Sequence, residues 1–285
     1  MKPVFDETIH TILNTRILDL ETHFDADVLF YYGLISEAVE KPFRDAVEEL
    51  KQEKDTRKRL CIVLNTPGGS AETVEKLVVI TRKHYSEVYF IVPDSAYSAG
   101  TIFCMSGDKI FMDYSSSLGP IDPQVYNGTK WVPALGYLDK VNEIIAKSKA
   151  KTVAPVELMM LNNIDLAELK LYEQARDLTI TLLKEWLVKY KFRLWEKHKD
   201  GSVVTEAEKE ARAELIANQL GDNNKWHSHG RSIDINRLQN ELKLQIDDYS
   251  NNMILRRLIR SYNDMICQYI SNNEADYFLH SKKLL

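Results

Sequence analysis

Three short, almost continuously apolar runs in the first third of the chain limit what it can fold into. They cover residues 27–35, 60–64 and 88–92. Runs of this length without polar alternation are typical of β-strands that are buried on both faces. Amphipathic helical patterns at 36–50 and 73–84 separate the runs. Strand and helix therefore alternate, which favours right-handed crossovers and predicts an α/β fold with a mainly parallel sheet.

The sequence as a whole suggests a division into four parts. Residues 1–24 carry weak helical signals and are expected to form a short N-terminal arm, and residues 25–136 are expected to hold the α/β core. Helical periodicity dominates the middle of the chain, so 137–222 is expected to be a helical insertion. The last part, 223–285, is expected to complete the core and to include a terminal helix.

Composition excludes several classes of protein. The chain has 285 residues, 44% of them apolar, which is enough to bury a full core. The net charge of -5 provides no broad basic surface, so nucleic acid is not an expected partner. Cys61, Cys104 and Cys267 are far apart and form no C-x-x-C pair, which argues against a disulfide framework and a zinc site. No run approaches the roughly 18–20 apolar residues of a membrane span, so we expect a cytoplasmic protein without one.

Two loops carry the candidate chemistry, because each follows a buried strand and precedes a helix. The first, Pro67-Gly68-Gly69-Ser70, contains glycines that allow backbone geometry a Cβ would forbid and let a substrate approach the main chain. In the second, Ser98 stands at the start of a helix predicted over 99–105, where free amides and the helix dipole favour negative charge. Each loop alone also has a structural interpretation, a tight turn in one case and a helix cap in the other. Strand ends in such a sheet are where a site is expected.

The two loops together, about thirty residues apart, are much more specific. The arrangement of residues 27–123 resembles the ClpP family: strand, helix, Asn65-Thr66-Pro67-Gly68-Gly69, strand, Ser98-Ala99-Gly100, strand and loop. The resemblance is weaker to signal-peptide peptidases and most specific to the ClpP-class serine dehydrogenase proteinases, in which a segment like Leu118-Gly119-Pro120-Ile121-Asp122-Pro123-Gln124 is expected after the nucleophile's strand. The resemblance implies a ClpP- and crotonase-like spiral of ββα units, with a mainly parallel sheet and a helical insertion.

The same resemblance implies roles for individual residues. It makes Ser98 the nucleophile of a serine endopeptidase that works through an acyl-enzyme, and it makes the amides of Gly69 and Ala99 an oxyanion hole. Gly68 and Ser70 would lie beside the bound substrate. The two loops, taken by themselves, favour the same nucleophile and the same oxyanion-binding turn. No cofactor is required for this chemistry.

The base that would activate Ser98 has more than one candidate. ClpP uses a histidine in the loop after the nucleophile's strand, whereas residues 119–123 contain none. The resemblance to the serine dehydrogenase proteinases implies Lys170, on a helix expected over 165–186. A lysine base must be buried enough to lose its proton near neutral pH. Three nearby leucines could bury Lys170, but two neighbouring glutamates equally indicate an exposed lysine.

His229 is the second candidate for the base. In ClpP the stretch before the closing helix supplies the carboxylate of the triad, and the resemblance of 226–244 to that region puts His229 or His227 near Ser98. Histidine has an intrinsic pKa suited to a general base. Two histidines with one residue between them could also hold a metal, but no third ligand is visible nearby, so no metal is expected. Asp122 could orient His229 or bind substrate, or it could cap a turn.

The resemblance also implies partners and leaves two alternatives open. Lys147, Lys149 and Lys151 fall where signal-peptide peptidases place a lysine, but three lysines in five residues indicate a solvated helix face. We expect a polypeptide substrate and a homo-oligomer built as a ring or from trimers, and an unfoldase partner is an open alternative.

One alternative function is that of a crotonase-type acyl-CoA enzyme, although a serine at a helix start argues against it. The other is a catalytically inactive scaffold with the same fold, which the missing loop histidine favours.

Overall fold

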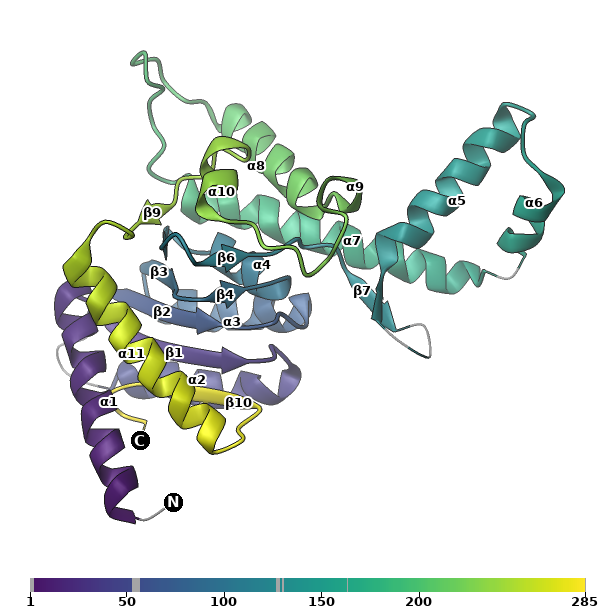
Figure 1. Ribbon diagram of the computed structural model, residues 1–285. Helices are drawn as coiled ribbons and strands as arrows, with labels where there is room; N and C mark the ends of the chain where they lie inside the picture. Colours follow the sequence, from purple (N-terminus) through teal and green to yellow (C-terminus); the bar gives the residue numbers. More distant parts are fainter. Residues whose placement is uncertain (1–2, 53–56, 127–128, 130, 163, 285) are drawn as a thin grey trace.

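The computed structural model describes residues 3–52, 57–126, 129, 131–162 and 164–284. A six-stranded sheet lies at its centre, with the strand order β10-β1-β2-β3-β5-β9 (Figure 1). Its strands are β1 Asp27–Gly33, β2 Arg59–Asn65, β3 Glu87–Val92, β5 Lys109–Met112, β9 Asp247–Asp248 and β10 Tyr277–His280. All neighbouring pairs from β1 to β9 are parallel, and β10 is antiparallel to β1. The prediction of an α/β fold with a mainly parallel sheet is confirmed.

The central strands are buried on both faces, as their apolar runs predict. In β1, Val28 and Phe30 face one layer of helices, while Leu29 and Tyr31 face the other. All four residues are fully buried, and burying one such side chain contributes about 1.5–3 kcal/mol. The strand ends two residues earlier than predicted, at Gly33, whose φ is +111° and whose missing side chain leaves room for the backbone of β10.

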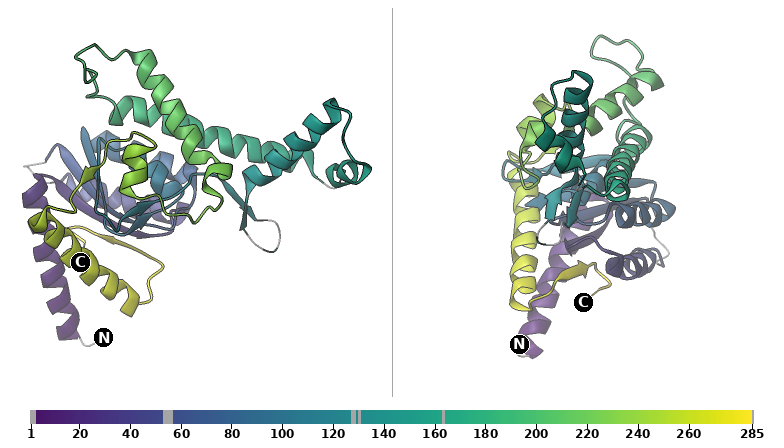
Figure 2. Two further views of the ribbon diagram at one scale, coloured as in Figure 1. Left: turned by 45° about the horizontal axis from the view of Figure 1, so that its top comes forward. Right: turned by 90° about the vertical axis from the view of Figure 1, so that its right-hand side faces the viewer.

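Helices cover both faces of the sheet, as Figures 1 and 2 show. On one face lie α2 Glu40–Leu50, α3 Ala71–His84 and α4 Ala99–Met105. On the other face, α1 Pro3–Phe24 and α11 Met253–Asn272 pack against each other and against the sheet. The body is therefore built of three layers, with the strands in the middle. None of the helices in the described part of the chain combines the length and apolar character needed to cross a bilayer.

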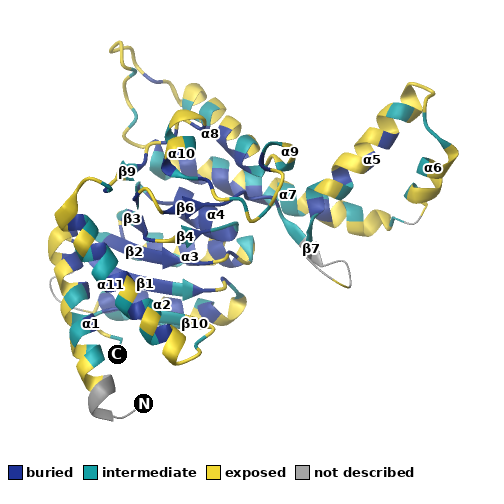
Figure 3. Ribbon diagram, viewed as in Figure 1, coloured by how far each residue is buried: buried dark blue, intermediate teal, exposed yellow. Residues whose placement is uncertain are grey.

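A helical arm projects from this body (Figure 2). The hairpin of β7 Gln124–Tyr126 and β8 Trp131–Pro133 leads into α5 Ala134–Lys149, which is followed by α6 Pro155–Leu161 and α7 Leu166–Trp186. The first part of α7 packs on α5, and its later part packs on the body. Most residues of α5 and α6 are exposed (Figure 3). The arm thus has little core of its own.

The chain returns from the arm to the body through a series of short elements. After α7 come the π-helical segment Leu187–Lys191, α8 Glu206–Gly221, α9 Asn223–Trp226 and α10 Ile235–Asn240. Helix α8 packs along α7, and the two helices join the same apolar core as α4. Their shared core fixes the position of the residues that follow, from α9 onward, against the sheet.

A second, shorter ladder of strands stands beyond the carboxyl ends of the parallel strands. It is formed by β4 Ser95–Ala96 and β6 Ser117–Leu118, which pair in parallel. Thr66 extends the ladder by pairing with Ala96, and Ile233 extends it on the other side by pairing antiparallel with Leu118. Four segments that are far apart in sequence therefore lie side by side. Each of them is followed or preceded within a few residues by one of the candidate site residues.

Candidate active site

The two glycine- and serine-containing loops are in direct contact. The Thr66 amide donates to the Ser95 carbonyl at 3.0 Å, and the Tyr97 amide donates to the Thr66 carbonyl at 3.1 Å. A methyl group at position 68 would lie 2.7 Å from Ser98 Cβ and 3.3 Å from Ser98 Oγ. Real Cβ atoms do not approach so closely, so only glycine fits at position 68 while Ser98 keeps its place. The contact brings the serine hydroxyl next to the backbone of the first loop.

Ser98 adopts a backbone conformation that non-glycine residues rarely take. Its φ is 52° and its ψ is -118°, and α4 begins at the next residue. Conformations of this kind cost about 1–3 kcal/mol and cluster at functional sites. A sharp, strained turn between strand and helix is how many hydrolases present a serine nucleophile. The turn is held in place by Thr101, whose hydroxyl bridges the carbonyls of Ala96 and Gly119 at 2.8 and 2.9 Å.

Two backbone amides beside Ser98 have no acceptor within the described parts of the chain. They belong to Gly69 and to Ala99, the first residue of α4. The residues on either side of Gly69 form backbone hydrogen bonds with Ile35. The Gly68 carbonyl accepts from the Ile35 amide at 2.8 Å, and the Ser70 amide donates to the Ile35 carbonyl at 2.9 Å. This leaves the Gly69 N–H itself free, at an exposed glycine with a φ of +146°. Free amides of this kind are suited to binding an oxyanion.

The side chain of Ser70, which is predicted to lie beside the substrate, takes part in capping α3. Its hydroxyl oxygen accepts from the Thr73 amide at 3.0 Å and caps the N-terminus of α3, and its hydroxyl donates to Glu72 at 2.8 Å. Both functions of the hydroxyl are therefore used within α3. The backbone of Ser70 is the part that lies beside Gly69, so a contact of Ser70 with substrate would be through the main chain.

Asp122 and His229 form a pair. His229 Nδ1 lies 3.0 Å from Asp122 Oδ1, and Asp122 is 1% exposed. The second carboxylate oxygen of Asp122 is buried and has no partner in the described chain. With Nδ1–H donating to the carboxylate, His229 Nε2 is left as a proton acceptor.

The ladder holds the segment of His229 beside the loop of Ser98. Leu118 and Ile233 exchange two backbone hydrogen bonds, at 3.0 and 2.8 Å. The Tyr97 hydroxyl, one residue before Ser98, lies 2.8 Å from the Ser232 hydroxyl, three residues after His229. In the described residues no hydrogen bond joins Ser98 Oγ to His229. Bonds between a nucleophile and its base are often long in ligand-free structures and tighten when substrate binds.

The other candidate bases lie in less suitable surroundings. Lys170 is on the surface of α7 with a 66% exposed side chain, and its Nζ lies 2.9 Å from Glu173. The hydrogen bond that Lys170 donates to Glu173 raises the pKa of Lys170, which is the opposite of what a neutral lysine base requires. His227 is exposed and ends α9 in a left-handed conformation, with a φ of 62°. The described residues contain no cluster of three or more potential metal ligands.

Sequence reasoning missed one residue that ties the two loops together. Asn263, on α11, is 1% exposed. Its side-chain amide donates to Asp94 at 2.7 Å, and its oxygen accepts from Asn65 at 2.6 Å. Asp94 opens the serine loop and Asn65 opens the glycine loop, so one side chain fixes both. The available signal was an asparagine on the apolar face of a helix, but nothing in the sequence indicates partners so far away.

Comparison with known proteins gives a match to one family. The family described as ClpP-like SDH-type serine proteinase matches residues 44–206. Two uncharacterized proteins of Methanocaldococcus jannaschii are 37% identical over 68 residues and 33% identical over 64 residues. These matches cover 24% and 22% of this chain and the same shares of the relatives, so the chain matches about a quarter of their length.

Two solved structures are also similar in outline. Both are mutants of the 1510-N membrane-bound stomatin-specific protease, one with alanine in place of a serine and one with alanine in place of a lysine, in complex with a substrate peptide. The first is 14% identical with a TM-score of 0.48 and covers 80% of this chain and 82% of its own. The second is 16% identical with a TM-score of 0.46 and covers 78% and 74%. The family match described above spans more than half of the residues of this chain. The chain therefore belongs to the ClpP-like SDH-type serine proteinase family.

Proposed function

We propose that this chain is a serine endopeptidase that hydrolyses polypeptides through an acyl-enzyme on Ser98. The observation that carries the proposal is the setting of this serine. It is held in a strained turn at the start of α4, in contact with Gly68, and two unbonded amides lie in the same two loops. A strained, half-buried serine beside free backbone donors is the arrangement that acyl transfer requires. Membership of the serine proteinase family supports the same reaction.

In the proposed reaction, Ser98 Oγ attacks the carbonyl carbon of a peptide bond. The oxygen of that carbonyl takes up the electron pair, and the amides of Gly69 and Ala99 bind the resulting oxyanion. The proton of Ser98 passes to His229 Nε2 and then to the amine that leaves. Water hydrolyses the ester on Ser98 by the same steps and restores the hydroxyl. Asp122 keeps His229 in the required tautomer and stabilises its charged form.

We prefer His229 to Lys170 as the base because of their surroundings. His229 is partly buried, is paired with a buried carboxylate, and belongs to a segment that the ladder ties to the Ser98 loop. Lys170 is exposed and paired with Glu173, which holds its proton. The proposed order along the chain is serine, aspartate, histidine, with both partners of the serine downstream of it.

The arm supports the further proposal that several copies of the chain assemble. Large apolar side chains on α6 and the start of α7 are exposed in the single chain: Val156, Leu158, Met159, Met160 and Leu166. Exposed apolar surfaces of this kind mark contacts with other protein surfaces. An assembly of copies would also restrict the Ser98 site to extended polypeptides.

Proteolysis of an unfolded polypeptide tests the proposed function. Wild-type protein is expected to cleave denatured casein, and Ser98→Ala is expected to reduce cleavage to background. Ser95→Ala is the matched control, because this serine is in the same loop and is expected to keep activity. Cleavage that persists in Ser98→Ala would contradict the proposal. A wild-type protein with no activity on any peptide or ester would instead fit an inactive scaffold.

A further inference from the structure

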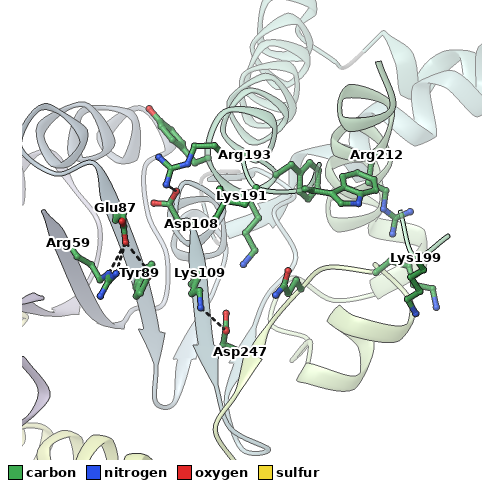
Figure 4. A pocket seen from close by; sticks show the side chains of 16 residues that line it. Arg59, Glu87, Tyr89, Asp108, Lys109, Lys191, Arg193, Lys199, Arg212 and Asp247 are labelled. Atoms are coloured by element: carbon green, nitrogen blue, oxygen red, sulfur yellow. Dashed lines mark hydrogen bonds and ion pairs between the residues drawn. The ribbon is translucent and has the colours of Figure 1, made fainter. Parts of the chain in front are cut away.

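A cavity of about 970 Å³ lies at the edge of the sheet opposite to Ser98. It is formed by the amino ends of the strands together with the π-helical segment and the chain that follows it. Arg59, Glu87, Lys109 and Asp247 line it, and each is the first residue of its strand. Figure 4 shows these residues beside Lys191 at the end of the π-helical segment. Since Ser98 follows the carboxyl end of β3, the two sites are separated by the length of the strands.

The cavity is strongly basic, although the chain as a whole is acidic. Its lining contains seven lysines and arginines against three carboxylates, an excess of four positive charges. Three cations are neutralised: Arg59 pairs with Glu87 at 2.8 Å, Arg193 with Asp108 at 2.9 Å, and Lys109 with Asp247 at 3.5 Å. The remaining four have no carboxylate partner in the described chain; they are Lys191, Lys199, Arg212 and Lys243. The excess charge is therefore uncompensated by the protein.

Lys191 is the central member of these four. It is half-buried, and its side chain reaches into the cavity. The ion pair of Lys109 and Asp247 lies on one side of it, and Arg212 and Lys199 lie on the other (Figure 4). Burial lowers the pKa of Lys191 to about 8, because the nearby carboxylates offset only part of the lost hydration. A charged amine without a partner in such a place destabilises the fold. A bound anion would supply the missing partner.

The aromatic side chains of the cavity help to define the ligand. The ring of Tyr89 lies 4.6 Å from the Arg59 guanidinium, and the ring of Tyr190 lies 3.8 Å from that of Arg82. One face of each of these tyrosine rings is therefore covered by a cation, while Phe192 and Trp195 add apolar surface to the lining. The groups of the lining without an ion pair are ammonium and guanidinium donors, which match phosphate oxygens. The volume is that of a small-molecule site.

We propose that this cavity binds a small anion that carries two or more phosphate groups, held by Lys191 and Arg212 and flanked by Lys199 and Lys243. Arg212 is half-buried, and its guanidinium donates to the carbonyl of Leu242, which fixes its position at the cavity wall. The two flanking lysines are exposed and add charge at the rim. The phosphate groups can belong to an inorganic polyphosphate or to a nucleotide. In either case the recognised chemistry is the phosphate chain.

Calorimetric titration of the full chain tests this site without any peptidase assay. Tripolyphosphate and ATP are titrated separately at a fixed NaCl concentration. One saturable site per chain is expected for at least one of them. Tighter binding of ATP would identify a nucleotide, and equal or weaker binding would identify the phosphate chain alone. Absence of saturable binding for both, or many weak sites per chain, would overturn the proposal. Because the readout is binding, this result is independent of the proposed activity.

Variants at the cavity test whether the named side chains hold the anion. Lys191→Met removes the charge and shortens the side chain by one atom, and Arg212→Ala removes the second anchor. Each is expected to weaken binding roughly 10- to 100-fold, the usual effect of losing a hydrogen bond to a charged group. Lys41→Ala is the matched control, because Lys41 is exposed and lies on α2, away from the cavity. The double variant Lys199→Ala/Lys243→Ala tests the rim in case a buried change disturbs folding. Unchanged affinity in all three cavity variants would overturn the assignment.

Discussion

At the carboxyl edge of the sheet, β2 and β3 end in two loops that are so close that Gly68 contacts Ser98. At the amino edge, the same two strands begin with Arg59 and Glu87, which line a basic cavity. The first edge is tightly packed, and the groups proposed to react there are a hydroxyl, two backbone amides and a histidine. The second edge is open, and four of its seven cations have no carboxylate partner in the described chain. Under the two proposals, one set of strands carries two sites, with covalent chemistry at one end and recognition of charge at the other.

The largest expected effect concerns the base at the carboxyl edge. His229→Ala is expected to lower the rate of peptide hydrolysis roughly 10⁴-fold, because Ser98 loses its proton acceptor. Lys170→Ala is expected to keep most of the activity, because its amine is exposed and paired with Glu173. Steady-state kinetics on a fluorogenic peptide distinguish the two bases. A collapse of activity in Lys170→Ala, with His229→Ala active, would reverse the assignment.

Gly68→Ala should have the next largest effect. The new methyl group would lie 2.7 Å from Ser98 Cβ, so either the serine or the Gly68-Gly69 peptide must move, and the oxyanion site would be lost. Loss of one oxyanion donor costs roughly 10²–10³-fold in rate. Gly136→Ala is the matched control, since a Cβ there meets nothing within 4 Å. Full activity in Gly68→Ala, with a folded protein by circular dichroism, would show that the two loops do not act together.

Asn263→Ala tests how firmly the carboxyl edge is held. The change removes the hydrogen bond that Asn263 donates to Asp94 and the one that it accepts from Asn65, and it leaves buried polar groups unpaired, which costs about 1–3 kcal/mol of stability. A displacement of the loops is expected to lower kcat roughly 10- to 100-fold. The exposed Gln268→Ala on the same helix serves as control. If stability falls in Asn263→Ala but kcat stays at the wild-type value, Asn263 only stabilises the fold and does not position the loops.

The effect expected at the amino edge concerns stability alone and leaves catalysis unchanged. In the folded protein the pKa of Lys191 is lowered from 10.5 to about 8. Between pH 8 and pH 10.5, the unfolded chain therefore binds a proton at Lys191 that the folded chain does not bind. Wild-type stability therefore decreases as the pH falls from 10.5 to 8, and the loss is complete below pH 8.

Lys191→Met removes this penalty. It is expected to be more stable than wild type at pH 7 by up to about 3 kcal/mol, with the difference disappearing toward pH 10.5. Urea denaturation of the ligand-free protein at pH 7 and pH 10 measures this difference, and Lys41→Met controls for loss of a surface charge. A stabilisation of equal size at both pH values would show that Lys191 is not held in a costly charged state.

The carboxyl edge could be predicted from the sequence because its information is local. Apolar runs identify β1, β2 and β3, and each loop follows such a run directly and precedes a helix, so Ser98 and the two glycines stand out together. The start of α3 was predicted two residues late, at Thr73, because the capping role of Ser70 was not recognised. The pairing of Asp122 with His229 was one of several alternatives, since residues 107 positions apart have no local signal of contact.

The amino edge could not be predicted, and the reason is again physical. Its cations come from β2 and β5, from the π-helical segment and the chain that follows it, from α8, and from the segment between α10 and β9. In the sequence, Lys191 and Lys199 lie in a charged stretch of the kind that usually faces solvent. Only the packing of α7 and α8 onto the sheet gathers these charges around one space. The same applies to Asn263, whose partners lie 169 and 198 residues away.

Labelling with a fluorophosphonate probe tests the central claim most directly, because such a probe reacts only with a serine whose hydroxyl is activated and whose oxyanion is stabilised. Peptide mapping of the labelled wild-type protein is expected to find the adduct on Ser98. Labelling is expected to be lost in Ser98→Ala and strongly slowed in Gly68→Ala. An adduct on a different serine, or a folded wild-type protein that takes up no probe, would contradict the account.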